Sequence, residues 1–133
     1  MKLNEAFGTD KALEDEGKWF DIGDNASVRV ARFGNDAHRK VLLKLREPYK
    51  ALLLRGGQIP DDVNDGIVTE SMANTILVDW KGMYDQDNNE IPFSVEAASQ
   101  AFSLYKDFLE LVSNLSLNAA NYRVTAQEDI VKK

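Results

Sequence analysis

The sequence predicts a mostly α-helical fold, in which a short N-terminal β-hairpin packs on a small helical domain. Apolar residues recur three or four positions apart over most of the chain after residue 35, which is the spacing of an amphipathic helix. Strict alternation of apolar and polar residues occurs only around residues 27–33. We expect one domain over 1–133, because a chain of 133 residues buries roughly two-thirds of its unfolded surface and needs no disulfide or metal to fold.

The chain begins with a polar, glycine-punctuated segment, residues 1–17, for which we expect flexibility. Residues 18–33 predict the hairpin. Its first strand lies at 19–22, the cluster Gly23-Asp24-Asn25 supplies the turn, and the alternating segment 27–33 supplies the second strand. Because an isolated two-stranded hairpin is only marginally stable, this hairpin must pack on the helices.

Residues 35–55 predict a helix with an interruption. Asn35 is a suitable N-cap, and Gly56-Gly57 ends the unit. Pro48 has no backbone N–H and disfavours helical geometry at the residue before it, so we expect a kink or two short helices. The apolar positions at helical spacing are Val41, Leu42, Leu45, Tyr49, Leu52 and Leu53.

A second helix is predicted over residues 69–84, after an acidic loop at 58–66. Thr69 or Asp65 would cap this helix, and Gly82 lies near its end. Its apolar residues fall three or four positions apart, at Ala73, Ile76, Leu77, Trp80 and Tyr84.

A third, long helix is predicted over residues 95–115, with Ser94 as its N-cap. Two apolar stripes give this helix a wide apolar arc. We therefore expect it to be central, packed on two neighbours, or to expose an apolar surface to a partner. Residues 118–131 show a weaker helical pattern.

The charges are divided between two segments. The chain has a formal net charge of −6, yet residues 29–55 contain eight basic residues against two acids, and residues 56–98 contain nine acids against one lysine. Such segments can remain solvated, pair within the fold, or join copies head to tail, which favours a homo-oligomer. The basic segment also raises the alternative of a basic-helix nucleic-acid-binding protein, although the acidic segment would repel a polyanion.

The residue content excludes several kinds of chemistry. With no cysteine and one histidine, the chain has no disulfide, no thiol nucleophile and no cysteine-containing zinc site. No glycine-rich phosphate loop or serine nucleophile motif is present. We therefore expect a binding protein that is not an enzyme and has no cofactor. No apolar run approaches the roughly 20 residues of a membrane span, and we expect a soluble intracellular protein.

One loop matches part of a calcium-binding pattern. Residues 85–96 have oxygen-bearing side chains at positions 1, 3, 5 and 12 of an EF-hand loop, namely Asp85, Asp87, Asn89 and Glu96. Two positions depart from the pattern, because Glu90 replaces the glycine of the sharp turn and Pro92 has no N–H to offer a paired loop. A single EF-hand-like module at 85–96 is the alternative that this loop leaves open.

The segment Trp80-Lys81-Gly82-Met83-Tyr84-Asp85-Gln86-Asp87-Asn88-Asn89-Glu90-Ile91-Pro92-Phe93-Ser94, followed by Ala97-Ala98, resembles the tail assembly chaperones of long-tailed, siphovirus-type bacteriophages. The upstream segment Gly17-Lys18-Trp19-Phe20-Asp21-Ile22-Gly23 is similar to the N-terminal hairpin of that family. The region from Phe108 to Tyr122-Arg123 is similar as well, so the resemblance extends over most of the chain.

The resemblance implies a role in viral morphogenesis without catalysis. Members of the family bind the tape measure protein in the host cell cytoplasm, help to recruit tail-tube subunits, and are absent from the mature virion. An apolar client helix would fit a groove or helical face on the chaperone. The candidate partner-binding residues are Trp80, Tyr84, Ile91, Phe93, Phe102 and Phe108. Each of them could instead belong to the hydrophobic core, where large apolar residues usually lie.

Overall fold

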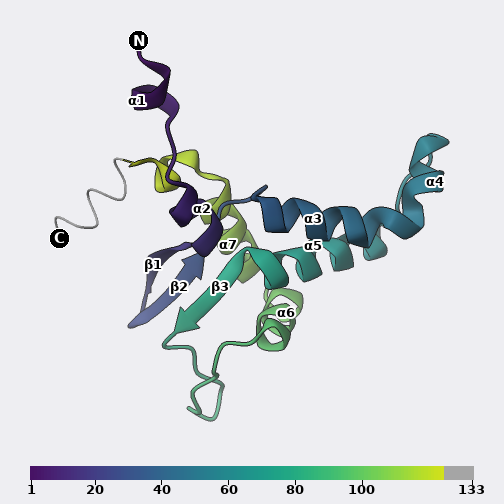
Figure 1. The fold of residues 1–133 in the computed structure, drawn as a ribbon. Coiled ribbons are helices and arrows are strands. Elements are labelled where there is room, and N and C mark those ends of the chain that lie inside the picture. Colours follow the sequence, from purple (N-terminus) through teal and green to yellow (C-terminus); the bar gives the residue numbers. More distant parts are fainter. Residues whose placement is uncertain (125–133) are drawn as a thin grey trace.

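The computed structural model describes residues 1–124 and shows a mixed α/β fold (Figure 1). A three-stranded antiparallel sheet in the order β1-β2-β3 packs against the helices α5, α6 and α7 (Figure 1). The expectation of a mostly α-helical domain with only a short hairpin is therefore wrong, because a third strand completes a sheet.

The N-terminal 17 residues form two short helices, α1 (Leu3–Phe7) and α2 (Lys11–Glu16), where the sequence predicted flexibility. The side chain of Asp10 caps α2 by accepting a hydrogen bond from the backbone N–H of Leu13. The N–H of Asp10 donates to the carbonyl oxygen of Tyr122 at 2.8 Å. Contacts with a distant part of the chain thus order this segment, and no local pattern predicts such contacts.

The predicted hairpin is present as β1 (Lys18–Gly23) and β2 (Ala26–Val30). Asp24 and Asn25 form its turn with φ values of 53° and 60°, a left-handed conformation that Asp and Asn tolerate better than most residues. Alternate residues of β2 are buried, as the alternation in the sequence predicts.

The third strand, β3 (Leu77–Lys81), lies where the sequence predicted the end of a helix over 69–84. Val28 pairs with Trp80 and Val30 with Leu77, and the register shifts between these two pairs. This bulge places Leu77 and Trp80, three residues apart, on the same buried face. A spacing of three is also helical, which explains the error.

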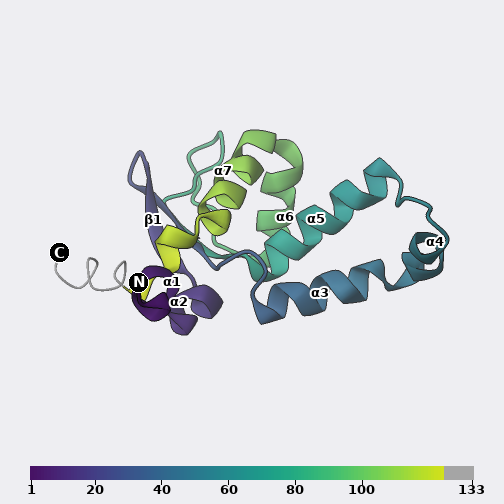
Figure 2. The same ribbon diagram turned by 90° about the horizontal axis from the view of Figure 1, so that it is seen from above.

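A helical arm projects from the sheet (Figure 2). It comprises α3 (Asp36–Arg46), the 3₁₀ helix η1 (Glu47–Tyr49), α4 (Lys50–Leu54) and α5 (Asp61–Thr75). The helices α3 and α5 run side by side, and α4 lies at their far end (Figure 2). We call residues 36–75 the arm.

The first half of the arm follows the sequence prediction. The side chain of Asn35 accepts a hydrogen bond from the N–H of His38 at 2.9 Å, which confirms the N-cap. The helix is broken at η1, which contains Pro48, and Gly56 follows α4 with a φ of 81°. The second half differs, because α5 begins at Asp61 inside the predicted loop and Pro60 precedes it without a side-chain cap.

The predicted long helix over 95–115 is two helices, α6 (Val95–Leu104) and α7 (Lys106–Leu117). The break is at Tyr105, which has extended backbone angles, and it allows α7 to pack against α6. Ser94 caps α6 as predicted, since its hydroxyl accepts from the N–H of Ala97 at 3.0 Å. Of the helix predicted over 118–131, η2 (Ala119–Tyr122) is present, and residues 125–131 lie outside the described part.

The core lies between the sheet and the three helices α5, α6 and α7. Its buried members are Val28, Val30, Met72, Ala73, Ile76, Leu77, Trp80, Ala98, Phe102 and Val112. β2, β3, α5, α6 and α7 each contribute an apolar side chain to this cluster, and Phe20 and Ile22 of β1 pack against it. The sheet, α6, α7 and the C-terminal end of α5 therefore form one unit, from which the rest of the arm extends.

Candidate partner-binding surfaces

Five of the six predicted partner-binding residues lie in one aromatic cluster. The indole Nε1–H of Trp80 donates to the carbonyl oxygen of Ile91 at 2.8 Å, and the ring of Phe93 stands edge-on to the indole with the centroids 5.3 Å apart. Phe102 stacks on Phe108 at 5.4 Å, and Phe108 lies 6.3 Å from Trp80. The cluster joins the loop after β3 to α6 and α7.

The members of this cluster differ in how much surface they offer. Trp80 is 7% exposed and Phe102 is 1% exposed, so both side chains belong to the hydrophobic core. Ile91, Phe93 and Phe108 are half-buried and pack against that core. A partner can therefore reach the cluster only through its half-buried members.

Tyr84, the sixth predicted residue, lies apart from the cluster. It is 60% exposed and forms an antiparallel backbone bridge with Glu90. Between these two residues the chain makes a tight turn, in which Oδ1 of Asp85 accepts hydrogen bonds from the N–H groups of Asp87 and Asn89, each at 2.9 Å. These hydrogen bonds lower the pKa of the Asp85 carboxyl from its usual value.

The turn does not have the geometry of an EF-hand. A strand, β3, replaces the helix that would precede the loop, and one carboxylate oxygen of Asp85 is already used by backbone N–H groups. Across residues 1–124, no group of three or more His, Asp or Glu side chains is placed to hold a metal ion. The resemblance of residues 85–96 to a calcium loop is therefore one of sequence spacing alone.

Helix α7 and the residue before it carry a partly exposed apolar strip. Phe108, Leu111 and Leu115 follow one another at intervals of three and four residues, which places them along one side of α7, and Tyr105 lies at the start of the helix. Tyr105 is 63% exposed and Leu111 is 38% exposed, whereas Phe108 and Leu115 are half-buried. We call these four residues the α7 strip. Through Phe108 the strip is continuous with the aromatic cluster.

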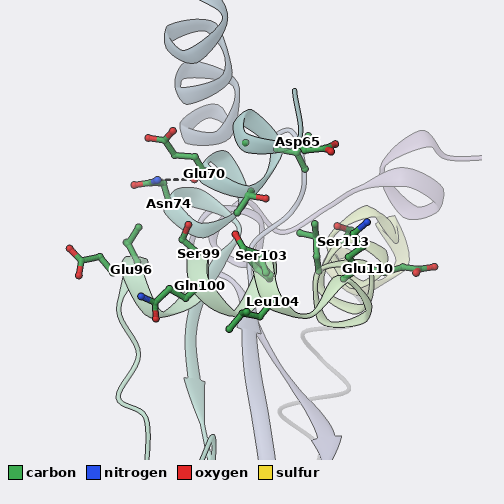
Figure 3. A pocket seen from close by; sticks show the side chains of 17 residues that line it. Asp65, Glu70, Asn74, Glu96, Ser99, Gln100, Ser103, Leu104, Glu110 and Ser113 are labelled. Carbon is green, nitrogen blue, oxygen red and sulfur yellow. Dashed lines mark hydrogen bonds between the residues drawn. The ribbon is translucent and has the colours of Figure 1, made fainter. Parts of the chain in front are cut away.

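The opposite side of α7 faces a groove between α5, α6 and α7 (Figure 3). The groove has a volume of about 1430 Å³. On α7 it is lined by Lys106, Leu109, Glu110 and Ser113. At roughly 100° per residue these positions lie on a different side of the helix from the strip, so α7 presents two separate surfaces.

The rim of the groove is acidic. Glu70 and Glu96 lie toward one end of the view in Figure 3, and Asp65 and Glu110 toward the other. Lys106 is the basic residue among those that line the groove. Among residues 1–124 none of these four carboxylates forms an ion pair. The residues that line the groove therefore carry a net formal charge of −3, from four carboxylates and one lysine.

The far end of the arm combines apolar and basic side chains. Leu43 is 72% exposed, Leu53 43% and Leu54 80%, and together with Arg46 and Lys50 they surround a shallow hollow of about 330 Å³. We call residues 43–55 the arm tip. Within the described chain, no ion pair joins the basic segment 29–55 to the acidic segment 56–98. The two segments pack side by side as α3 and α5, but this packing does not include an ion pair between them among residues 1–124.

The sequence predicts a partner surface on a wide apolar arc of one helix over 95–115 and on the aromatic cluster. In the structure the break at Tyr105 divides that arc between α6 and α7, and Leu104, Tyr105 and Leu111 are exposed. The groove needs three helices from distant parts of the sequence. The opposite charges of segments 29–55 and 56–98 were the signal that pointed toward the arm tip and the acidic rim.

Within residues 1–124 no helix has the length and apolar character needed to cross a membrane. A family model described as YdaY prophage protein matches residues 33–133. The matched range includes the arm, the groove and the α7 strip. No curated protein and no solved structure matches the chain.

Proposed function

The chain belongs to the YdaY prophage protein family and is phage-derived, and we propose that it acts as a tail assembly chaperone. In this role it binds the tape measure protein and helps to recruit tail-tube subunits. It acts in the host cell cytoplasm and is absent from the finished virion. The role is one of binding, and it requires neither an enzymatic group nor a cofactor.

The α7 strip is the observation that carries the proposal. A client with a long apolar helix exposes residues at intervals of three and four, and the strip repeats this interval on the chaperone. Two aliphatic and two aromatic side chains supply the contact, and aromatic residues are frequent at the centres of protein interfaces. Covering the client in this way would prevent its apolar surface from self-associating before the tube forms.

The aromatic cluster supports the strip from beneath. Phe108 belongs to both, and its ring stacks on Phe102 and lies near Trp80, with centroid distances of 5.4 Å and 6.3 Å. A side chain that is already fixed loses little conformational freedom when a partner binds. The buried members, Trp80 and Phe102, thus position the binding surface and do not form it.

The test is a pull-down of tagged full-length protein from cells that express the neighbouring phage genes, with bound chains identified by mass spectrometry. We expect recovery of a long, helix-rich chain or of a tail-tube subunit. Leu111→Glu places a charge in the strip and should lower recovery about tenfold, the loss typical of an interface residue that contributes about 1.4 kcal/mol.

Leu117→Glu is the matched control. Leu117 is 58% exposed and lies on the same helix, off the strip, so the same substitution there should leave recovery unchanged. Recovery of the wild-type protein without a helix-rich or tail-tube partner would refute the chaperone role. Equal losses in the two variants would refute the assignment of the strip.

A further inference from the structure

The acidic groove and the arm tip have complementary chemistry. The groove is lined by four carboxylates and one lysine, and its lining also includes the exposed apolar side chains of Val95 and Leu104. The arm tip contains four basic residues, one acidic residue (Glu47) and three exposed leucines. The basic residues of the tip are Lys44, Arg46, Lys50 and Arg55. Each surface thus offers the charge that the other lacks, together with apolar surface to bury.

One copy cannot bring these two surfaces together. The tip lies at the far end of the arm from α6 and α7, and α5 spans the distance between them (Figure 2). No ion pair connects them within the described residues. Within residues 1–124, contact between an arm tip and a groove therefore requires a second copy of the chain.

We propose that the arm tip of one copy docks in the acidic groove of the next copy. Leu53 and Leu54 enter between α5 and α6, where Ser99 and Ser103 are small and lie between the acidic ends of the groove (Figure 3). Arg46 and Lys50 lie against the rim carboxylates. Burial of the leucines supplies affinity, and the charges fix the orientation of the two copies.

The contact joins two different surfaces, so it does not close as a symmetric dimer. Each docked copy still offers one tip and one groove, and the copies assemble head to tail into a ring or an open chain. Client binding is unaffected, because the α7 strip faces away from the groove. The inference thus goes beyond the proposed function and places self-assembly and client binding on separate faces.

The test is analytical ultracentrifugation of the full-length protein over a concentration series. At low ionic strength the mean mass should rise with concentration beyond that of a dimer of the 14.9 kDa chain. The mean mass should decrease in about 1 M salt, where the screening length falls to about 3 Å and the charge pairs weaken while the leucine contact remains. A monomer at every concentration in low salt would overturn the proposal.

Charge reversal identifies the two surfaces. The tip variant Arg46→Glu/Lys50→Glu and the groove variant Glu70→Lys/Glu110→Lys should each weaken association about tenfold, because attraction is replaced by repulsion. The single reversals Lys40→Glu and Glu16→Lys, at exposed positions outside tip and groove, are the matched controls and should leave association unchanged.

Restored association between complementary variants distinguishes this contact from a general charge effect and from misfolding. A mixture of the tip variant and the groove variant should associate again, and so should a chain that carries all four substitutions. Failure of both restorations, with each variant folded by circular dichroism, would overturn the proposed contact. A groove variant that still recovers the client in the pull-down supports separate faces, and its loss of the client would refute them.

Discussion

Tyr122 offers the sharpest test of how the C-terminal part of the fold is held. Its side chain is fully buried, and its hydroxyl donates a hydrogen bond to the carbonyl oxygen of Val30 at 2.9 Å, across 92 residues of sequence. Tyr122→Phe keeps the ring and removes the hydroxyl. The free energy of unfolding should fall by about 1–2 kcal/mol, since the hydrogen bond is lost and a buried acceptor loses a partner.

The measurement is unfolding in urea at pH 7, monitored by circular dichroism. In a thermal melt of a domain of this size, the melting temperature should fall by about 4 °C for each kcal/mol of stability that is lost. Tyr84→Phe is the matched control. Tyr84 is 60% exposed, so the same change there should remain within about 0.5 kcal/mol of the wild type. Equal stability of Tyr122→Phe and the wild type would refute the reasoning.

The same residue predicts a dependence of stability on alkaline pH. Burial raises the pKa of the Tyr122 hydroxyl above its usual value of about 10. Above that pH the unfolded chain releases a proton that the folded chain retains, so stability decreases as pH rises, by up to about 1.4 kcal/mol per pH unit. Tyr122→Phe should show a smaller decrease between pH 9 and 11. Identical slopes in the two proteins would contradict the assignment.

Three further predictions concern local geometry. Gly66→Ala should stabilise the protein by about 0.5–1 kcal/mol, because a Cβ in this helical position meets no atom outside the adjacent residues and the local helix backbone within 4 Å. Gly82→Ala should destabilise it by at least as much, because φ is 72° and the Cβ would overlap with the carbonyl oxygen of Asn25. Thermal melts of the two variants should shift in opposite directions. Asn35→Ala should cost about 1–2 kcal/mol in urea unfolding through loss of the N-cap. Asn35→Asp should recover only part of it, because a carboxylate accepts from the N–H of His38 but cannot donate to the carbonyl oxygen of Arg32 as the Asn35 amide does. Burial, and then the charge of Arg46, lowers the pKa of His38, the single histidine, below its usual 6.5, so its contribution to stability is present above that pH and is lost as pH falls through the lowered pKa. His38→Gln should lack this decrease, and an unchanged slope would contradict the prediction.

Features that depend on a few neighbouring residues could be predicted from the sequence. Asn35 and Ser94 cap helices because their side-chain oxygens reach an N–H three residues away, a contact that needs no other part of the fold. Pro48 breaks its helix for an equally local reason, the absence of an N–H. The turn at Asp24 and Asn25 follows from the tolerance of these residues for positive φ.

The third strand could not be predicted in this way. Leu77 and Trp80 have a spacing that fits one face of a helix and also fits a bulged strand, and the edge of β2 decides between these possibilities by pairing with the segment. The break at Tyr105 is similar, since neither glycine nor proline marks it, and packing of α7 against α6 fixes the extended backbone there.

The candidate surfaces likewise combine features that are local in the sequence with features that depend on packing. Aromatic and charged residues, and the segments in which they are concentrated, can be located from the sequence alone, because composition and spacing are local properties. The burial of Trp80 and Phe102 and the exposure of Tyr105 and Leu111 depend on how the elements pack. The tertiary structure also separates the acidic groove from the basic arm tip. Burial and electrostatic pairing depend on which distant segments pack together, and the charge pattern of a single segment does not specify its neighbours.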